Sequence, residues 1–284
     1  MDGRDQKDVS IDVRSKKGRS KTLQTSSIPL KIHIIWLGSM LPEVGERFYQ
    51  SAAKAWKLHN PNYEVHLWTD RRTYPHEQQA QILADMQRFA EQNQLIFHQV
   101  THGDCYSDAF YEKEAGIEAR GPHAPLDANW GAASDILRVN ILLDLGGIYV
   151  DTDITCTGPL SALPQGSTIL CRIEPAPLST PSNNIIATTR NHPCMVEFRT
   201  IQQQAFTLLY NDQPPGIFDL YRTSKGSLES ARAAWTMNNT GPMALTDALL
   251  RGEGGFKAAM VSHNMQAYEF PMTNITVDYH HSWV

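Results

Sequence analysis

The sequence predicts an α/β fold with a mostly parallel central sheet flanked by helices. Residues 30–100 alternate strand, helix, strand, helix and strand, the order of repeated βαβ units. Residues 128–153 then read as an apolar helix, a glycine pair and a further strand. Hydrophobic residues make up 41% of the chain and charged residues 19%, which is typical of a globular protein.

Apolar spacing and turn residues define the elements of the first half. Ile82, Met86 and Phe89 recur at helical spacing, whereas the runs on either side are β-branched and aromatic. The expected order is a strand at 30–38, a helix in 48–63 that breaks before Pro61, a strand at 63–70, a helix in 75–95 and a strand at 95–100.

The second half begins with a helix at 128–147 that the pair Gly146 and Gly147 closes. A strand at 148–153 follows, and residues 157–190 are expected to form loops around one strand at 168–173. A helix opens at His192-Pro193, and Pro242 stands near the first turn of another. The first of these helices has an apolar face of Met195, Phe198, Phe206 and Leu209.

Length and charge limit the domain organisation and the partners. The first 27 residues are polar and basic without apolar period, so we expect a disordered tail at 1–27 and a folded domain at 28–284. The net charge of −5 gives no reason to expect nucleic-acid binding. No run of about 18 apolar residues exists, so no transmembrane segment is expected. The N-terminus also lacks the apolar stretch of a signal peptide.

Two aspartates, Asp151 and Asp153, end the apolar run GGIYVDTDIT. Being two residues apart on a strand, they are expected to project on the same side. They could hold a divalent metal on a nucleotide-sugar diphosphate, or serve as the nucleophile strand of an aspartate-dependent phosphatase. They could also be two incidental acids at a solvated strand end.

Residues from two other elements are expected near these acids. Asp135 and Arg138 are three apart on the preceding helix and share one face. Trp36 lies at the end of the first strand, and ligands of open α/β sheets bind outside the carboxyl ends of the strands. The phosphatase hypothesis also needs a later acidic pair for Mg²⁺, which the sequence lacks. The aspartates after Asp153 are the isolated Asp212, Asp219, Asp247 and Asp278.

Four segments together resemble one enzyme superfamily. They are IHIIWLG, HNPNYEVHLWTD, AASDILRVNILLDLGGIYVDTDI and NNIIATTRNHPCM. The combined pattern S-D-x-x-R, seven residues, G-G-x-Y-x-D-x-D is similar to that of the D-x-D sugar-binding glycosyltransferases. That superfamily includes the catalytic domains of the large clostridial glucosylating toxins and the yeast-type initiating α-mannosyltransferases.

The resemblance implies a GT-A-like (Rossmann-like) fold, a nucleotide-sugar donor, bound Mn²⁺ or Mg²⁺ and retention at the anomeric carbon. By position, Trp36 would stack on the nucleotide base, and Asp135 with Arg138 would hold the hydroxyls of the transferred sugar. Asp151 would contact ribose and sugar, and Asp153 would bind the metal. Three further residues would line the donor site, of which Tyr149 also suits a core position and the asparagine pair also suits a turn cap: Tyr149, Asn183 and Asn184.

The C-terminal sequence YHHSWV resembles the metal- and diphosphate-binding end of such domains. His281 and Ser282 would add metal ligands, and Ser282 with Trp283 would contact the diphosphate of the donor. We expect this end to close over the donor as a lid, which would exclude water. A tail that simply packs on the surface is the alternative.

The expected function is a soluble, metal-dependent, retaining glycosyltransferase that moves a hexose or N-acetylhexosamine, with a UDP-sugar favoured as donor. The favoured acceptor is a host protein, modified by a bacterial effector or toxin delivered into the host cytosol. A cytoplasmic transferase acting on a glycan or lipid-linked sugar is the alternative, and an inactive nucleotide-sugar-binding protein is a third hypothesis.

Overall fold

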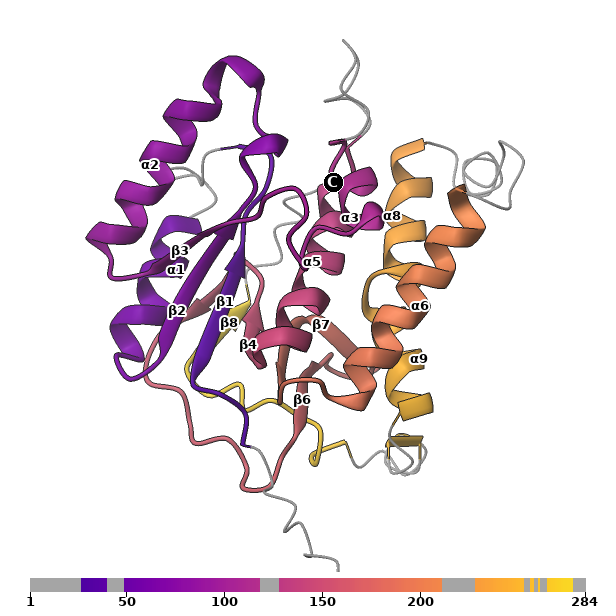
Figure 1. The fold of residues 1–284 in the computed structure, drawn as a ribbon. Coiled ribbons are helices and arrows are strands. Elements are labelled where there is room, and N and C mark those ends of the chain that lie inside the picture. Colours follow the sequence, from indigo (N-terminus) through magenta and orange to yellow (C-terminus); the bar gives the residue numbers. More distant parts are fainter. Residues whose placement is uncertain are drawn as a thin grey trace, which may run out of the picture.

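A six-stranded sheet forms the centre of the computed structural model (Figure 1). The structure describes residues 27–39, 49–117, 128–210, 228–252, 256–257, 260 and 265–277. The strands of the sheet, in spatial order, are β3 (Ile96–Gln99), β2 (Glu64–Thr69), β1 (Lys31–Ile35), β4 (Gly147–Val150), β7 (Pro181–Thr188) and β6 (Ile169–Ile173). A smaller sheet pairs β5 (Ile154–Cys156) with β8 (Ile275–Val277).

Strand directions make the large sheet mostly parallel. Strands β3, β2, β1 and β4 run parallel to their neighbours, whereas β7 runs antiparallel to both β4 and β6. Helices flank this sheet, so the predicted α/β class is confirmed. The helices are α1 (Tyr49–His59), α2 (Gln79–Gln92), α3 (Ala109–Glu114), α5 (Trp130–Leu145), α6 (Pro193–Tyr210), α8 (Leu228–Asn239) and α9 (Pro242–Gly252). Short 3₁₀ turns, η1 (Arg71–Thr73) and η2 (His76–Gln78), join β2 to α2.

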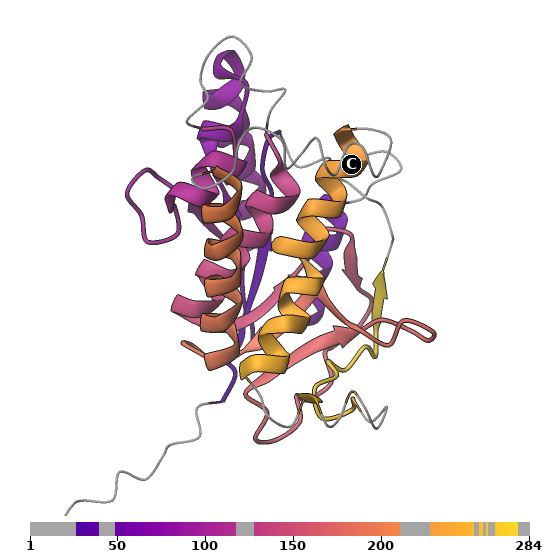
Figure 2. The ribbon, with the colours of Figure 1, turned by 90° about the vertical axis from the view of Figure 1, so that its right-hand side faces the viewer.

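Each face of the sheet has its own apolar layer. Helices α1 and α2 contribute Trp56, Met86 and Phe89 to one cluster, and α5, α6 and α9 build the other, larger cluster. Figure 2 shows α6 beside α9 on the second face. The Trp56 indole also donates to the Ile154 carbonyl at 2.8 Å, which ties α1 to the small sheet.

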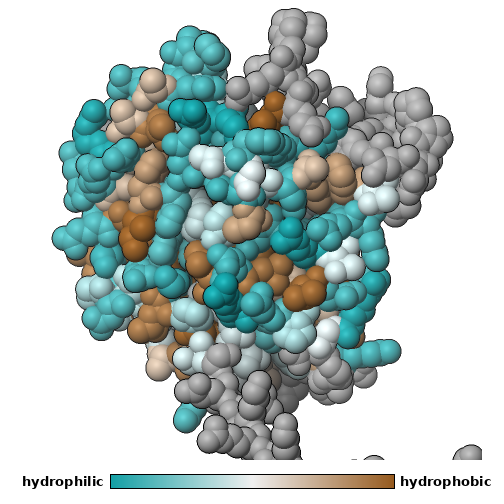
Figure 3. All heavy atoms as spheres, in the orientation of Figure 1, coloured by the Kyte–Doolittle hydropathy of each residue, from teal (hydrophilic) through white to brown (hydrophobic). Residues whose placement is uncertain are grey.

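The outer surface mixes polar and apolar residues. On the face shown in Figure 3, hydrophilic residues surround the apolar ones. Among the helices that the structure describes, none combines the length and the apolarity needed to cross a membrane.

The link between α5 and β4 depends on glycine. Gly146 and Gly147 have φ angles of +62° and +103°, a region that other residues rarely adopt. A Cβ on Gly147 would lie 2.8 Å from the Lys31 carbonyl oxygen of the neighbouring strand. The predicted glycine boundary of this helix is therefore correct, and it sets the register of the strand that leads to the aspartates.

Two expectations from the sequence were wrong. The strand expected at 148–153 ends at Val150, because the chain turns there and continues as β5 in another sheet. Residues 181–188 form β7 rather than a loop, and this strand pairs with β4 and β6. The segment begins with proline, serine and asparagine, which are typical of loops, although apolar residues follow them. Residues 1–26 and 278–284 lie outside the described residues, and with them most of the expected tail and the whole expected lid.

Candidate active site

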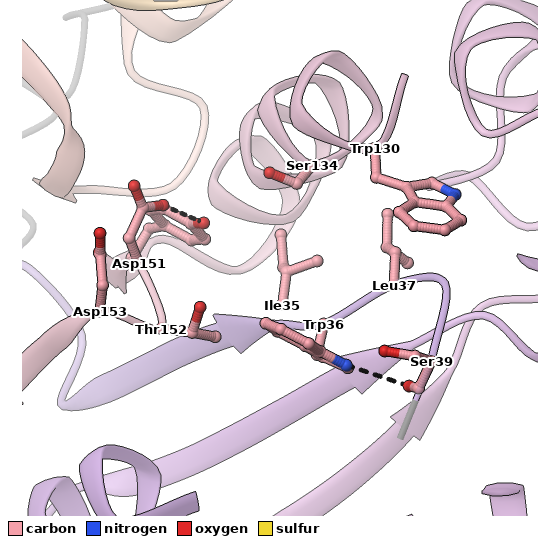
Figure 4. A pocket seen from close by; sticks show the side chains of 10 residues that line it. Ile35, Trp36, Leu37, Ser39, Trp130, Ser134, Asp151, Thr152 and Asp153 are labelled. Carbon is pink, nitrogen blue, oxygen red and sulfur yellow. Dashed lines mark hydrogen bonds between the residues drawn. The ribbon is translucent and has the colours of Figure 1, made fainter. Parts of the chain in front are cut away.

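A pocket opens at the carboxyl ends of β1 and β4, where ligands of α/β sheets bind. The empty space at this pocket amounts to about 640 Å³, which includes space open to solvent. Its lining consists of Ile35, Trp36, Leu37, Ser39, Trp130, Ser134, Tyr149, Asp151, Thr152 and Asp153. Figure 4 shows the aspartates at one end of this pocket and Trp130 at the other.

The acidic end of the pocket is the turn Asp151-Thr152-Asp153 between β4 and β5. Two backbone bonds fix it, from Ile154 N to Asp151 O at 3.1 Å and from Asp151 N to Asn184 O at 2.9 Å. The expectation that both acids belong to a strand is thus corrected. They nevertheless project in the same direction, because the turn brings them side by side (Figure 4).

Arg138 links the helix to this turn. Its guanidinium lies 2.9 Å from Asp135 Oδ1 and 3.1 Å from Asp151 Oδ1, and only 3% of the residue is exposed. It also lies 4.1 Å from the centre of the Tyr149 ring. Burial alone would lower the pKa of Arg138, but Asp151, Tyr149 and Asp135 raise it above its ordinary value. The side chain is therefore a fixed positive charge between two carboxylates.

Asp135 lies behind the pocket rather than in its lining. It is 5% exposed, and its Oδ1 accepts from Asn183 Nδ2 at 2.8 Å, while its Oδ2 accepts from the Thr240 hydroxyl at 2.9 Å. Burial raises the pKa of Asp135 to about 6, against the lowering effects of Arg138, Thr240 and Asn183. Both oxygens thus already have protein partners, in addition to any contact with a sugar.

Asp151 is one of the two carboxylates that line the pocket. Its side chain is 24% exposed and accepts from the Tyr149 hydroxyl at 2.6 Å as well as from Arg138. Burial, followed by the charge of Asp151, raises the pKa of Tyr149 well above its ordinary value, although Arg138 opposes this. Tyr149 is therefore a neutral donor that orients Asp151, and it is buried, as its expected core position required.

Two tryptophans form the aromatic part of the pocket. Trp36 is half-buried directly after β1, and its indole donates to the Ser39 carbonyl at 3.0 Å. Trp130 begins α5 and is 37% exposed, with its ring over Gly38. A Cβ on Gly38 would come within 2.7 Å of that ring, so only glycine lets the two segments approach this closely. Sequence reasoning missed Trp130, although its place at the start of the Asp135 helix was a usable signal.

Residues of β2 and η1 hold the Trp36 segment in place. The Thr69 hydroxyl donates to the Trp36 carbonyl at 2.8 Å, and the Gly38 amide donates to Thr73 Oγ1 at 2.9 Å. The Trp36 amide in turn donates to the Trp68 carbonyl at 3.0 Å. The tryptophan is thus anchored both through its backbone and through its indole N–H.

The asparagine pair lies within β7, which rules out the alternative that it caps a turn. Asn183 is buried and holds Asp135 through its amide and Arg138 through its carbonyl, at 2.5 Å from Nη1. Asn184 is half-buried and meets Asp151 through its backbone. Neither lines the pocket. His281, Ser282 and Trp283 lie outside the described residues.

The carboxylates of the turn suit a hard divalent cation. Within the described ranges, no group of three or more His, Cys, Asp or Glu side chains is arranged to hold a metal ion. Mg²⁺ and related ions, however, are commonly held by one or two carboxylates together with phosphate oxygens of a substrate. Asp153, with Asp151 beside it, fits that second type of site.

Comparison with known proteins agrees with this geometry. Residues 46–170 match the family described as "Glycosyltransferase sugar-binding region containing DXD motif". A stretch of 136 residues, 48% of the chain, is 31% identical to "Subversion of eukaryotic traffic protein A" of Legionella pneumophila, of which it covers 18%. Over 213 residues the chain is 25% identical to "Inositol phosphoceramide mannosyltransferase 3" of Schizosaccharomyces pombe, covering 75% of this chain and 47% of that protein.

The fold has solved counterparts. The structure titled "PaToxG Glycosyltransferase" superimposes with a TM-score of 0.59 and 18% identity, over 86% of this chain and 79% of that one. The chain spans less than half the length of the two curated relatives above. The α/β sheet is thus that of the GT-A glycosyltransferases. The stretch that matches the DXD-containing glycosyltransferase sugar-binding family, residues 46–170, includes Asp135, Arg138 and the aspartate turn.

Proposed function

We propose that this protein is a metal-dependent, retaining glycosyltransferase that moves a hexose or N-acetylhexosamine from a nucleotide sugar, preferably a UDP-sugar, to an acceptor. One observation carries the proposal. A pocket with an aromatic side and an acidic turn lies at the carboxyl ends of the strands, and a buried arginine holds its acid Asp151. Such a pocket offers a base-stacking surface and a cation-binding edge at the same time.

The aromatic side suits the nucleoside. Trp36 is half-buried and lines the pocket, and its segment is fixed through the backbone, so we assign its ring as the platform for the base. Stacking on an aromatic ring contributes roughly 1–3 kcal/mol per base and tolerates different bases. The preference for a UDP-sugar comes from the family resemblance. Trp36 supplies an aromatic surface on which uracil or guanine would stack.

The acidic side suits the diphosphate and the sugar. Asp153 would hold Mn²⁺ or Mg²⁺, with His281 and Ser282 as further ligands from the C-terminal end. When bound, this ion would neutralise the charge of the departing diphosphate. Asp151, oriented by Tyr149 and Arg138, accepts hydrogen bonds from ribose and sugar hydroxyls.

Arg138 and Asp135 act together behind Asp151. Arg138 remains charged in its buried position and holds the Asp151 carboxylate in place at the pocket. Asp135 and Asn183 fix the guanidinium from the other side. We assign the contact with sugar hydroxyls to this set, and we assign no protein nucleophile.

The C-terminal end would complete the site. Ser282 and Trp283 would contact the diphosphate, and the segment 280–284 would order as a lid when donor binds. Excluding water in this way limits wasteful hydrolysis of the donor.

The acceptor divides two forms of the proposal. The similarity to a Legionella pneumophila protein named for the subversion of eukaryotic traffic supports a bacterial effector that modifies a host protein in the host cytosol. The similarity over 75% of the chain to a protein named as an inositol phosphoceramide mannosyltransferase supports a glycan- or lipid-directed enzyme. We favour the effector, because its relative is the more identical of the two.

Donor turnover without acceptor tests the activity. The purified chain is incubated with UDP- and GDP-sugars, with Mn²⁺, Mg²⁺ or a chelator, and release of free sugar and nucleotide is followed. Metal-dependent release of one sugar with its anomeric configuration retained is expected, and Asp153→Asn should abolish it. Binding without turnover would instead indicate an inactive nucleotide-sugar-binding protein. Labelled-sugar transfer into host-cell protein, compared with a lipid extract, then separates the two acceptor classes.

A further inference from the structure

A threonine far from the DXD motif in sequence reaches the buried acid of the site. Thr240 lies between α8 and α9, is fully buried, and donates its hydroxyl to Asp135 Oδ2 at 2.9 Å. The chain separation is 105 residues, so the contact depends on how α8 and α9 pack against α5. Thr240 is outside the 46–170 region that matches the family.

The junction that carries Thr240 is tightly built. Gly241 follows it, and a Cβ there would meet the Thr236 carbonyl oxygen at 3.1 Å. Gln202 of α6 donates its amide to the Asp135 carbonyl at 3.3 Å and to the Thr240 carbonyl at 3.1 Å. Three helices and one junction therefore fix the hydroxyl against the carboxylate, which excludes a chance surface contact.

We propose that Thr240 is a positioning residue of the donor site: its hydroxyl fixes the carboxylate of Asp135, which in turn holds Arg138 against Asp151. The inference rests on the proposed glycosyltransferase function for its consequence in turnover. The chain of contacts itself is independent of that function, running from Thr240 to Asp135 at 2.9 Å, from Asp135 to Arg138 at 2.9 Å and from Arg138 to Asp151 at 3.1 Å.

The hydroxyl matters because Asp135 is a buried acid. Its pKa is raised to about 6, by burial first and also by the charge of Asp151, against the lowering effects of Arg138, Thr240 and Asn183. Tyr149 and Asp153 are further titratable groups beside this cluster, and the raised pKa of Tyr149 leaves that residue neutral. Without the Thr240 hydroxyl, the ionised form of Asp135 loses one of its donors, and protonated Asp135 no longer holds Arg138 by charge.

The test compares Thr240→Val, Thr240→Ser and a matched control, Thr246→Val. Thr246 lies on α9, is 7% exposed and donates to the Pro242 carbonyl at 2.9 Å, without contact to Asp135. Thr240 also lies 3.2 Å from its own i−4 carbonyl, of Thr236, so both valine variants lose the same kind of backbone contact. They differ in whether the hydroxyl reaches Asp135.

The first measurement is the pH dependence of metal-dependent donor turnover. For Thr240→Val we expect the acid limb of the profile to move up by roughly one pH unit, because a hydrogen bond to a charged group has about that effect on a pKa. At pH 6 this is a loss of up to roughly tenfold, which shrinks by pH 8. Thr240→Ser and Thr246→Val should keep the wild-type profile. An unshifted Thr240→Val profile would overturn the inference.

The second measurement needs no enzymatic activity. Because only ionised Asp135 depends on the hydroxyl, the loss of stability in Thr240→Val should be larger at pH 8 than at pH 5, by up to roughly tenfold in the unfolding equilibrium constant. Urea unfolding at both pH values measures this loss of stability. The loss of stability in Thr246→Val should be the same at pH 5 and at pH 8. If Thr240→Val does not fold, Thr240→Ala removes the same hydroxyl with less bulk.

These outcomes separate the two proposals. A wild-type chain that turns over no nucleotide sugar refutes the proposed function, and the stability comparison then still decides on Thr240. Equal destabilisation at pH 5 and pH 8 refutes the role of Thr240, even in an active enzyme.

Discussion

Replacing one buried histidine should flatten the response of the fold to mild acid. His33 of β1 is fully buried; its Nε2 bonds to the Gly146 carbonyl at 2.9 Å, and its Nδ1 accepts from Trp68 Nε1 at 3.2 Å. A proton on Nδ1 would face the indole N–H and break that bond. Burial first, then the charges of His66, His98 and Lys31, lower the pKa of His33 to about 3, while the Gly146 carbonyl opposes them.

The magnitude follows from linkage. Unfolded His33 titrates near 6.5, so between 6.5 and about 3 the unfolded chain binds more protons than the folded one. The stabilisation is therefore fully present above pH 6.5 and is lost as pH falls towards 3. Its whole size is on the order of 5 kcal/mol, of which about 2 kcal/mol is lost between pH 6.5 and pH 5.

His33→Gln keeps a donor for Gly146 and removes the titration. Urea unfolding, followed by tryptophan fluorescence, gives the free energy of unfolding of both proteins at pH 7 and pH 5. Their difference should shrink by about 2 kcal/mol on acidification. Asp135 has a pKa raised to about 6, so its contribution to stability changes with pH in the opposite direction. This contribution is the same in both proteins and cancels when their free energies of unfolding are subtracted.

His76→Gln, a change at an exposed histidine of η2, is the control and should leave the pH dependence as in the wild type. A constant difference between wild type and His33→Gln at the two pH values would refute the reasoning. In that case His33 would be charged in the folded protein, or its surroundings would rearrange to accept the proton.

Three shorter predictions concern the donor site. Asp153→Asn should abolish Mn²⁺-dependent turnover while leaving the melting temperature within a few degrees, and wild-type activity with Mn²⁺ would show that Asp153 is not the ligand. Trp36→Ala should weaken donor binding by roughly 1–3 kcal/mol in calorimetry, and unchanged affinity in a folded variant would place the base elsewhere. Deleting residues 280–284 should lower transfer sharply without changing donor-free stability. Equal hydrogen-exchange protection of that segment with and without UDP-sugar and Mn²⁺ would contradict the lid.

Local patterns were enough to predict the centre of the fold. The α5–β4 unit is predicted by a local pattern, because an apolar helix, two glycines and an apolar strand follow one another in the sequence. The order of β1, α1, β2, α2 and β3 follows likewise from apolar period and turn residues. Arg138 and Asp135 were placed on one helix face for the same reason, three residues being close to one turn.

Long-range contacts were beyond such patterns. Residues 181–188 carry proline, serine and asparagine at one end, so no local rule identifies a central strand that two neighbours complete. Thr240 reaches Asp135 across 105 residues, and nothing near Thr240 in sequence indicates an acid. Asp151 and Asp153 were assigned to a strand because apolar residues continue at Ile154, whereas the chain turns between two sheets there.

The balance of charge in the site leads to a final prediction. Asp135, Asp151 and Asp153 bring three carboxylates to one region, and Arg138 offsets one of them. These carboxylates would repel a diphosphate that approaches the acidic turn. Solvent and salt screen this repulsion only weakly, because the carboxylates are buried or partly buried. A divalent cation on Asp153 reverses this sign, because a bound ion is the largest charge in such a site.

Metal and nucleotide should therefore bind as a pair. Calorimetry of UDP, with Mn²⁺ and with a chelator, should show strong binding in the first case and weak binding in the second. Asp153→Asn should lower affinity in Mn²⁺ yet raise it in chelator, because the substitution removes a repelling charge along with the ligand. A merely structural role for Asp153 predicts the same change under both conditions. A lower UDP affinity in Mn²⁺ together with a higher UDP affinity in chelator follows only if the Asp153 carboxylate repels the diphosphate and a bound metal ion bridges the two. A loss of UDP affinity under both conditions would refute that argument.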